Sequence, residues 1–190
     1  MHPPIILAST SPYRRQLLER LGLPFTVEAP GIEEARLPGE SPERMVQRLA
    51  EQKAGAVYQR HPEAVVIGSD QAAVVDGEIL GKPGDRQRAF QQLKRASGKR
   101  LEFLTGLCVL GRGRKESAVI PFGVVFRTLS DQQIESYLRR EQPYDCAGSF
   151  RSEGLGIILV ERMEGEDPHA LIGLPLIRLV DMLKTFQIEL

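Results

Sequence analysis

Residues 64–83 contain an acidic side chain placed where it could do chemistry on phosphate groups. The apolar run Val65-Val66-Ile67 predicts a strand, because a short β-branched run bounded by turn residues is typical of a strand covered on both faces. We expect this strand to end at Gly68-Ser69-Asp70-Gln71, which would hold Asp70 rigidly where water and ligand can reach it. A carboxylate so placed can handle water or bind a metal ion.

A basic residue follows within the same stretch. Asp76-Gly77 lies between two apolar runs and predicts a two-residue β-hairpin. The hairpin would turn the chain back and bring Lys82 towards Asp70, so that the lysine handles anionic oxygen while the acid handles water or metal. The alternative is that Asp70 caps a turn and Lys82 is a solvated surface residue, and these residues alone leave both interpretations open.

A second candidate anion site lies near the amino terminus. Residues 5–8 predict a short strand that runs into Ser9, and a helix follows with Ser11 as its N-cap and Pro12 at its first position. The free amides of that helix start, together with the hydroxyls and Arg14-Arg15, form a ready anion site. The alternative is that the serines only cap the helix and the arginines are only solvated.

A long helix is predicted to begin at Ser41-Pro42. Its apolar positions follow the 3.6-residue period and are Met45, Val46, Leu49, Ala50, Ala54 and Val57. Lys53 lies near the edge of this stripe, where most lysines extend to solvent. Glu34 lies in the loop before this helix, next to Glu33, and adjacent acids in a loop are usually solvated.

The remaining pattern predicts one α/β domain over residues 1–190 with a mixed central sheet flanked by helices. The chain shows no internal repeat, low-complexity segment or linker. The other predicted elements are a helix from Asp85 to Ser97-Gly98, strands 101–110 and 118–128 joined by residues 111–114, a helix from Ser130, a strand at 157–160 and a helix at 174–186.

Composition excludes several classes of function. Lysine plus arginine and aspartate plus glutamate both count 25, so the chain lacks the basic field that drives nonspecific nucleic-acid binding. Cys108 and Cys146 lie far apart without metal-ligand spacing, which favours free thiols of a reducing compartment. No signal peptide or membrane-spanning run is apparent, so we expect a soluble, cytoplasmic protein.

Motifs from nearly the whole chain together resemble the Maf family of nucleoside triphosphate pyrophosphatases. They are Ala8-Ser9-Thr10-Ser11-Pro12 before Arg14, Glu34, Glu51-Gln52-Lys53-Ala54, Gly68-Ser69-Asp70-Gln71, Gly81-Lys82-Pro83, Ser152-Glu153-Gly154 and Gly173-Leu174-Pro175-Leu176. The resemblance implies a two-lobed α/β fold with a cleft between the lobes. It also implies hydrolysis of a noncanonical or modified nucleoside triphosphate to the monophosphate and diphosphate with a divalent cation (Mg²⁺, Mn²⁺ or Co²⁺), and it points to a homodimer.

The resemblance assigns roles to residues in this chain. Asp70 matches the general base, and Lys53 and Lys82 match two essential lysines. Ser9 and Arg14 match a phosphate-contacting loop, while Glu34 matches an acid that could hold the metal together with Asp70.

Three departures from the commoner motif resemble the branch that hydrolyses N7-methyl-GTP: Tyr13 in place of arginine, Gln71 in place of threonine and Glu153 in place of glutamine. N7-methylation puts positive charge on guanine, so Tyr13 removes a like charge and offers an aromatic face. Glu153 can accept hydrogen bonds from the ring N–H and amino group of guanine, a donor pair that thymine lacks. The alternatives are a dTTP and UTP pyrophosphatase of the same family and a non-catalytic nucleotide-binding regulator of cell division.

Overall fold

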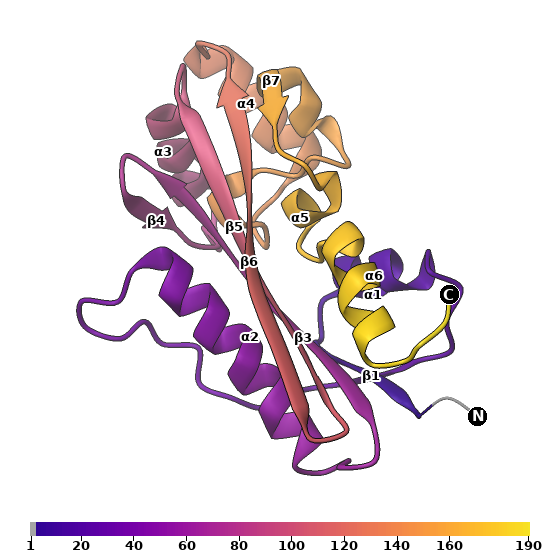
Figure 1. The fold of residues 1–190 in the computed structure, drawn as a ribbon. Helices are drawn as coiled ribbons and strands as arrows, with labels where there is room; N and C mark the ends of the chain where they lie inside the picture. Colours follow the sequence, from indigo (N-terminus) through magenta and orange to yellow (C-terminus); the bar gives the residue numbers. More distant parts are fainter. Residues whose placement is uncertain (1–2) are drawn as a thin grey trace. The chain divides into compact units, whose positions relative to one another are not determined.

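The computed structural model describes residues 3–190, which form two compact units (Figure 1). The first unit comprises residues up to Gln71 with Thr105–Ile120 and Asp167–Leu190, and the second comprises Ala72–Leu104 with Pro121–Glu166. Two units agree with the expectation of two lobes. The expected cleft, and the assignment of residues 1–190 to a single domain, stay predictions.

The described residues form a seven-stranded mixed sheet in the order β2-β1-β3-β5-β6-β7, with β4 paired to β3. This confirms the predicted α/β class. The strands are β1 (Ile5–Ala8), β2 (Thr26–Glu28), β3 (Val65–Val75), β4 (Glu78–Leu80), β5 (Arg100–Gly111), β6 (Arg114–Phe126) and β7 (Val160–Glu164). β3, β5 and β6 each contribute residues to both units.

In the first unit, β1 pairs in parallel with β2 and β3, and helices cover both of its faces. The helices of this unit are α1 (Pro12–Glu19), α2 (Pro42–Tyr58), α5 (Pro168–Ile172) and α6 (Leu176–Thr185). Ile5 and Leu7 pack in the core cluster that contains residues of α1 and α6, whereas Ile6 and Ala8 pack in the cluster that contains residues of α2. Alternate side chains of β1 therefore pack into two separate apolar cores, one on each face of the strand.

α2 approaches β3 closely because β3 has glycine at position 68. A Cβ atom added to Gly68 would lie 2.2 Å from the carbonyl oxygen of Ala50 and 2.8 Å from the amide nitrogen of Ala54, both in α2. Such distances are below van der Waals contact, and backbone atoms cannot rotate away as the end of a side chain can. The glycine is thus required by packing.

We expect Gly68→Ala to lower the free energy of unfolding by about 1–3 kcal/mol, the usual cost of overpacking a core. Gly55→Ala, within α2, is the matched control, because nothing lies within 4 Å of its added Cβ. That control should be neutral or stabilise the protein by up to about 1 kcal/mol, since alanine is the better helix former. Urea denaturation of both variants makes the measurement, and equal stability of the two would contradict the packing argument.

The second unit contains the two predicted caps and the predicted hairpin. Asp76 and Gly77 both have positive φ, 50° and 76°, as the turn between β3 and β4 requires. α3 (Arg86–Ala96) begins after the N-cap Asp85, and α4 (Asp131–Glu141) begins after Ser130, which forms a capping box with Gln133. β7 pairs antiparallel with β6.

The strand predicted at 118–128 is β6, Arg114–Phe126, and it begins earlier because the turn after β5 is only Arg112-Gly113, both at positive φ. Three other predicted boundaries were also wrong. β3 does not end at Gly68 but continues to Val75, so Asp70 lies inside a strand. The side chains of Ser69 and Gln71, which suggested a turn, instead hydrogen-bond to backbone carbonyl groups of β5 and of α5 with its C-cap. Residues 155–159 form a 3₁₀ helix, Leu155–Leu159, before β7, and the Val160 amide that ends it donates to the carbonyl of Ile157, three residues earlier. The C-terminal helix begins at Leu176, after Pro175 and the positive-φ Gly173.

Candidate active site

The first unit contains a buried ammonium group that lies between two carboxylates. The Lys53 Nζ atom lies 2.7 Å from Asp70 Oδ1 and 3.0 Å from Glu34 Oε1. Lys53 is 4% exposed and Asp70 6% exposed, whereas the Glu34 side chain is 55% exposed. Lys53 therefore does not extend to solvent, and its charge is compensated by two carboxylates that lie far apart in the sequence.

Strand alternation explains why Lys53 meets Asp70. Residues two apart on a strand share a face, so Asp70 projects to the same side of β3 as Gly68, the side that α2 covers. On α2, Lys53 directly precedes Ala54, which contacts Gly68. The close helix-to-strand packing at Gly68 thus brings the lysine to the acid.

The opposite face of β3 carries Ser69 and Gln71, whose side chains are held by backbone carbonyl groups. The Ser69 hydroxyl lies 2.8 Å from the Gly106 oxygen and 2.9 Å from the Gly173 oxygen. Gln71 Nε2 lies 2.7 Å from the carbonyl oxygen of Ala170 in α5. This side-chain nitrogen anchors β3 to α5, and the predicted substrate-binding role of Gln71 stays a prediction.

Arg14 and Ser9 lie together, as the phosphate-loop prediction requires. Arg14 Nε donates to the carbonyl oxygen of Gly173 at 2.9 Å, and Arg14 Nη1 lies 3.5 Å from Ser9 Oγ. Ser9 Oγ also accepts from the Ser11 amide at 3.1 Å. Burial lowers the pKa of Arg14, and the charges of Asp70 and Glu34 offset part of this shift. The guanidinium is therefore close enough to both acids to interact with them electrostatically.

Sequence reasoning missed the role of the Gly173 carbonyl group, which accepts hydrogen bonds from both Arg14 and Ser69. Gly173 ends α5 with a φ of 119°, in a left-handed conformation that favours glycine. The sequence signal for this position was the glycine itself in the motif Gly173-Leu174-Pro175-Leu176. A backbone acceptor has no side-chain signature, so its partners could not be read from the residue types.

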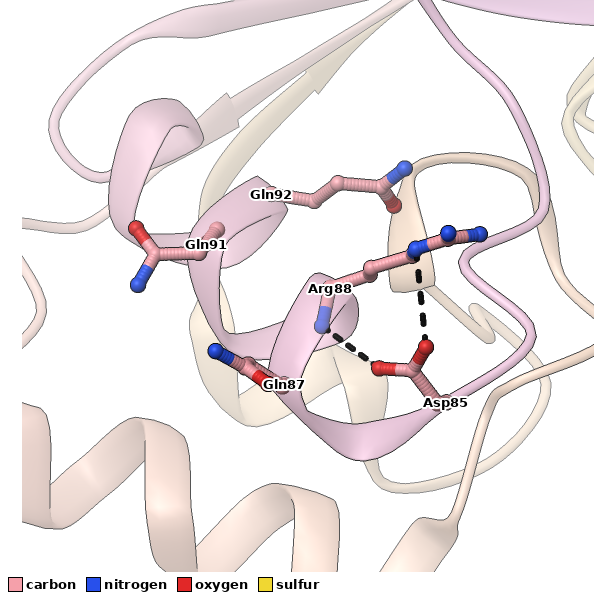
Figure 2. A pocket seen from close by; sticks show the side chains of 5 residues that line it. All are labelled: Asp85, Gln87, Arg88, Gln91 and Gln92. Atoms are coloured by element: carbon pink, nitrogen blue, oxygen red, sulfur yellow. Dashed lines mark hydrogen bonds and ion pairs between the residues drawn. The ribbon is translucent and has the colours of Figure 1, made fainter.

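Lys82 belongs to the second unit, so its predicted proximity to Asp70 stays a prediction. It is exposed and directly follows Gly81, whose carbonyl oxygen accepts a hydrogen bond from Gln92 Nε2 at 3.0 Å. Nearby in sequence, the start of α3 borders a polar hollow of about 610 Å³ that Figure 2 shows. Its lining residues are Asp85, Gln87, Arg88, Gln91 and Gln92. None of the predicted catalytic, substrate-binding or metal-binding residues lines it.

Glu153 is exposed on a loop of the second unit, and residues of α4 contact this loop on both sides of Glu153. Glu141 in α4 accepts from the Leu155 amide at 2.5 Å and from Arg151 Nη1 at 3.0 Å. The Tyr137 hydroxyl accepts from the Arg151 amide at 3.1 Å. The loop is therefore fixed on both sides of Glu153, and the Glu153 carboxylate itself accepts a hydrogen bond from Ser152 Oγ at 2.9 Å.

A family model described as Maf-like protein matches residues 4–186. The chain belongs to the Maf family. A Nitrosococcus oceani protein named 7-methyl-GTP pyrophosphatase is 57% identical over 184 residues, which cover 96% of this chain and 92% of that protein. A Pseudomonas aeruginosa protein of the same name is 54% identical over 190 residues, which cover 99% of each. The solved Ham1 protein of Staphylococcus aureus aligns at 18% identity and a TM-score of 0.46 over 67% of this chain and 72% of that one.

Glu34 and Asp70 are the two side chains predicted to hold a divalent cation. Each places one carboxylate oxygen against Lys53, and the second oxygen of each is not part of those contacts. Mg²⁺ is commonly bound by one or two carboxylates plus substrate phosphates, so this donor set fits such an ion once phosphates are present. No group of three or more potential protein ligands occurs in residues 3–190.

The two cysteines of this Maf protein are free, as predicted. Burial raises the pKa of Cys108 to about 11 and that of Cys146 to about 12, so both thiols are protonated near neutral pH. No helix within the described part of the chain has both the length and the apolar character needed to cross a membrane.

We expect Lys53→Met to lower the free energy of unfolding by about 3–5 kcal/mol, because it leaves Asp70 buried without its cation. Lys115→Met is the matched control: Lys115 pairs with Glu51 at 2.6 Å, but its side chain is 52% exposed, and exposed pairs contribute about 1 kcal/mol or less. Adding Asp70→Asn to Lys53→Met should restore part of the loss, since an amide costs less to bury than a charge. Chemical denaturation measures all three, and a Lys53→Met protein as stable as Lys115→Met would contradict the interpretation.

Proposed function

We propose that this Maf protein hydrolyses N7-methyl-GTP to N7-methyl-GMP and diphosphate and so removes a modified nucleotide from the cellular pool. The observation that carries the proposal is the Asp70–Lys53–Glu34 cluster, in which a buried ammonium lies between two carboxylates. The shared name of the relatives, 7-methyl-GTP pyrophosphatase, supports the substrate.

In the proposed reaction, a water molecule attacks the α-phosphorus while Asp70 orients it and accepts its proton. The bond from the α-phosphorus to the bridging oxygen breaks, and its electron pair leaves with the diphosphate. Lys53 and Arg14 stabilise the negative charge that develops on the phosphate oxygens, and the resemblance adds Lys82 to this group. A divalent cation bound by Glu34 and Asp70 would neutralise further phosphate charge when present.

We assign recognition of the base to Tyr13 and Glu153. A tyrosine ring stabilises a cationic guanine through a cation–π contact worth about 0.5–2 kcal/mol. The exposed Glu153 carboxylate can accept two hydrogen bonds from one guanine edge, and a pyrimidine lacks that donor pair. N7-methylguanine, with its positive charge and its pair of donors, therefore fits an aromatic ring and a carboxylate better than a pyrimidine base does.

A substrate panel tests the proposal directly. Diphosphate release is measured with N7-methyl-GTP, GTP, dTTP, UTP and CTP under the same divalent-cation conditions. We expect N7-methyl-GTP to exceed GTP in kcat/KM by a few-fold to about thirtyfold, which is the cation–π energy converted at about 1.4 kcal/mol per tenfold. Preference for UTP or dTTP would favour the pyrimidine branch of the family, and nucleotide binding without diphosphate release would favour a regulator.

The same proposal includes action in the cytoplasm, which the absence of a recognisable signal peptide in the sequence favours, and assembly as a homodimer, to which the resemblance points. The balanced charge of the chain, 25 basic against 25 acidic residues, suits a small-molecule substrate better than a nucleic acid. Light scattering on the purified protein checks the assembly, and a monomer at working concentrations would remove the dimer from the proposal.

A further inference from the structure

The segment between β2 and α2 carries Glu34 without the support of a helix or strand. Residues 29–41 have no regular secondary structure, and most of their side chains are exposed. Glu34 contacts Lys53 at 3.0 Å through a side chain that is 55% exposed. A carboxylate on an irregular segment loses conformational entropy when it is held in one position. Because the Glu34 side of its pair with the buried Lys53 is solvated, that pair offsets only part of this cost. Other contacts must hold this part of the chain.

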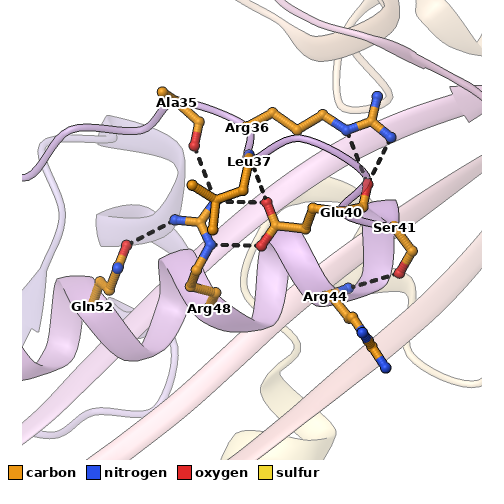
Figure 3. A network of polar contacts seen from close by, with 8 residues as sticks. All are labelled: Ala35, Arg36, Leu37, Glu40, Ser41, Arg44, Arg48 and Gln52. Carbon is orange, nitrogen blue, oxygen red and sulfur yellow. Dashed lines mark hydrogen bonds and ion pairs between the residues drawn. The ribbon is translucent and has the colours of Figure 1, made fainter.

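Arg48 in α2 supplies such contacts (Figure 3). Its Nε and Nη2 atoms lie 2.6 and 2.8 Å from the two carboxylate oxygens of Glu40, in a bidentate pair. Nη2 also donates to the carbonyl oxygen of Ala35 at 3.0 Å, directly after Glu34. Nη1 donates to Gln52 Oε1 at 3.0 Å, directly before Lys53. The Arg48 guanidinium group thus links Ala35, which is next to Glu34, with Gln52, which is next to Lys53.

The Glu40 carboxylate is largely buried and ionised, which suits it to pair with Arg48. Its side chain is 8% exposed, and hydrogen bonding to Arg48, against some desolvation, lowers its pKa to about 2. Its Oε2 also accepts from the Leu37 amide at 3.1 Å, and its carbonyl oxygen accepts from Arg36 Nη2 at 2.7 Å. Residues 35–40 therefore form a closed turn, and Arg48 holds that turn at both ends.

We propose that the Arg48–Glu40 pair positions Glu34 against Lys53, and that both are positioning residues for the proposed hydrolysis. Because Arg48 and Lys53 lie on the same helix, five residues apart, the helix sets the distance between the pair and the site. Glu34 then needs only its own side-chain rotamer to reach Lys53. This inference rests on the proposed function for its effect on rate, but not for its effect on the segment.

The first experiment measures the segment itself. Hydrogen exchange of residues 33–40 is compared in the wild type, Arg48→Met, Arg48→Lys and Arg44→Met. Arg44, one turn earlier in α2, is exposed, and in Figure 3 its side chain points away from the cluster. We expect faster exchange in both Arg48 variants, because lysine cannot replace a bidentate fork, and no change in Arg44→Met. Unchanged exchange in Arg48→Met would overturn the proposal, whether or not the protein proves to be a pyrophosphatase.

The second experiment separates positioning from a general loss of stability. We expect Arg48→Met to lower kcat for N7-methyl-GTP by about ten- to a hundredfold, the cost of a misplaced site group. In a Glu34→Gln background the same change should have almost no further effect, because Arg48 acts through Glu34. Losses that multiply in the double variant would refute this. Glu40→Gln, which keeps the side chain's size, repeats the test should Arg48→Met fold poorly.

Discussion

Asp70→Asn is expected to lower turnover of N7-methyl-GTP by about 10²–10⁴-fold, the contribution of a positioned general base. Asparagine keeps the size of the side chain and can still accept a hydrogen bond from Lys53, which lies 2.7 Å from Oδ1 in the wild type. It cannot accept the proton of an attacking water at neutral pH. The substitution therefore removes the chemistry while changing the shape of the site very little.

Asp76→Asn is the control for this measurement. Asp76 lies in the turn between β3 and β4 with a φ of 50°, a conformation that asparagine tolerates, so the hairpin should persist. Its side chain is 53% exposed and pairs with Lys99. We expect unchanged diphosphate release from this variant. Near-normal turnover by Asp70→Asn would remove Asp70 from the role of base, provided that thermal denaturation shows the variant folded.

The second large effect concerns the choice of base. Glu153→Gln combined with Tyr13→Arg should lower the preference for N7-methyl-GTP over UTP by up to about 10⁴-fold in kcat/KM, the limit for a site that closes around the base and leaves Glu153 unpaired when the matching donors are missing. Glutamine presents both a donor and an acceptor, and arginine repels the methylated base. The two changes therefore act in the same direction.

The two single variants separate the contributions of Tyr13 and Glu153 to this change in substrate preference. Tyr13→Arg alone should change the ratio of N7-methyl-GTP to GTP by at most about thirtyfold, the range of one cation–π contact. Glu153→Gln alone should act mainly on the ratio of guanine to pyrimidine substrates. Glu161→Gln, an exposed acid on β7, serves as the control and should leave every ratio unchanged. An unchanged substrate ranking in the double variant would refute the roles of both residues.

Much of the local structure follows from the sequence because its causes are local. Ser11, Ser41, Asp85 and Ser130 cap the helices that they were predicted to start, since a cap depends on residues only three positions away. Asp76-Gly77 forms the predicted turn for the same reason. The six apolar positions of α2 are all buried, as their period predicted.

The tertiary structure alone decided the surroundings of the candidate site. Asp70 lies within β3 because the polar residues that suggested a turn, Ser69 and Gln71, reach carbonyl groups about a hundred residues away in the sequence. Likewise, nothing near Arg48 in the sequence indicates that it would hold a loop through Glu40 and Ala35.

Residue types and their order thus determined which groups could take part in chemistry: Asp70, the two lysines Lys53 and Lys82, and an arginine in the capped helix after the first strand. Packing decided that Lys53 is buried between two carboxylates, because Gly68 lets α2 approach β3 closely enough for the pair to form. A close approach between a helix and a strand depends on the shapes of both surfaces. That information is distributed along the chain and becomes visible only when the elements are packed together.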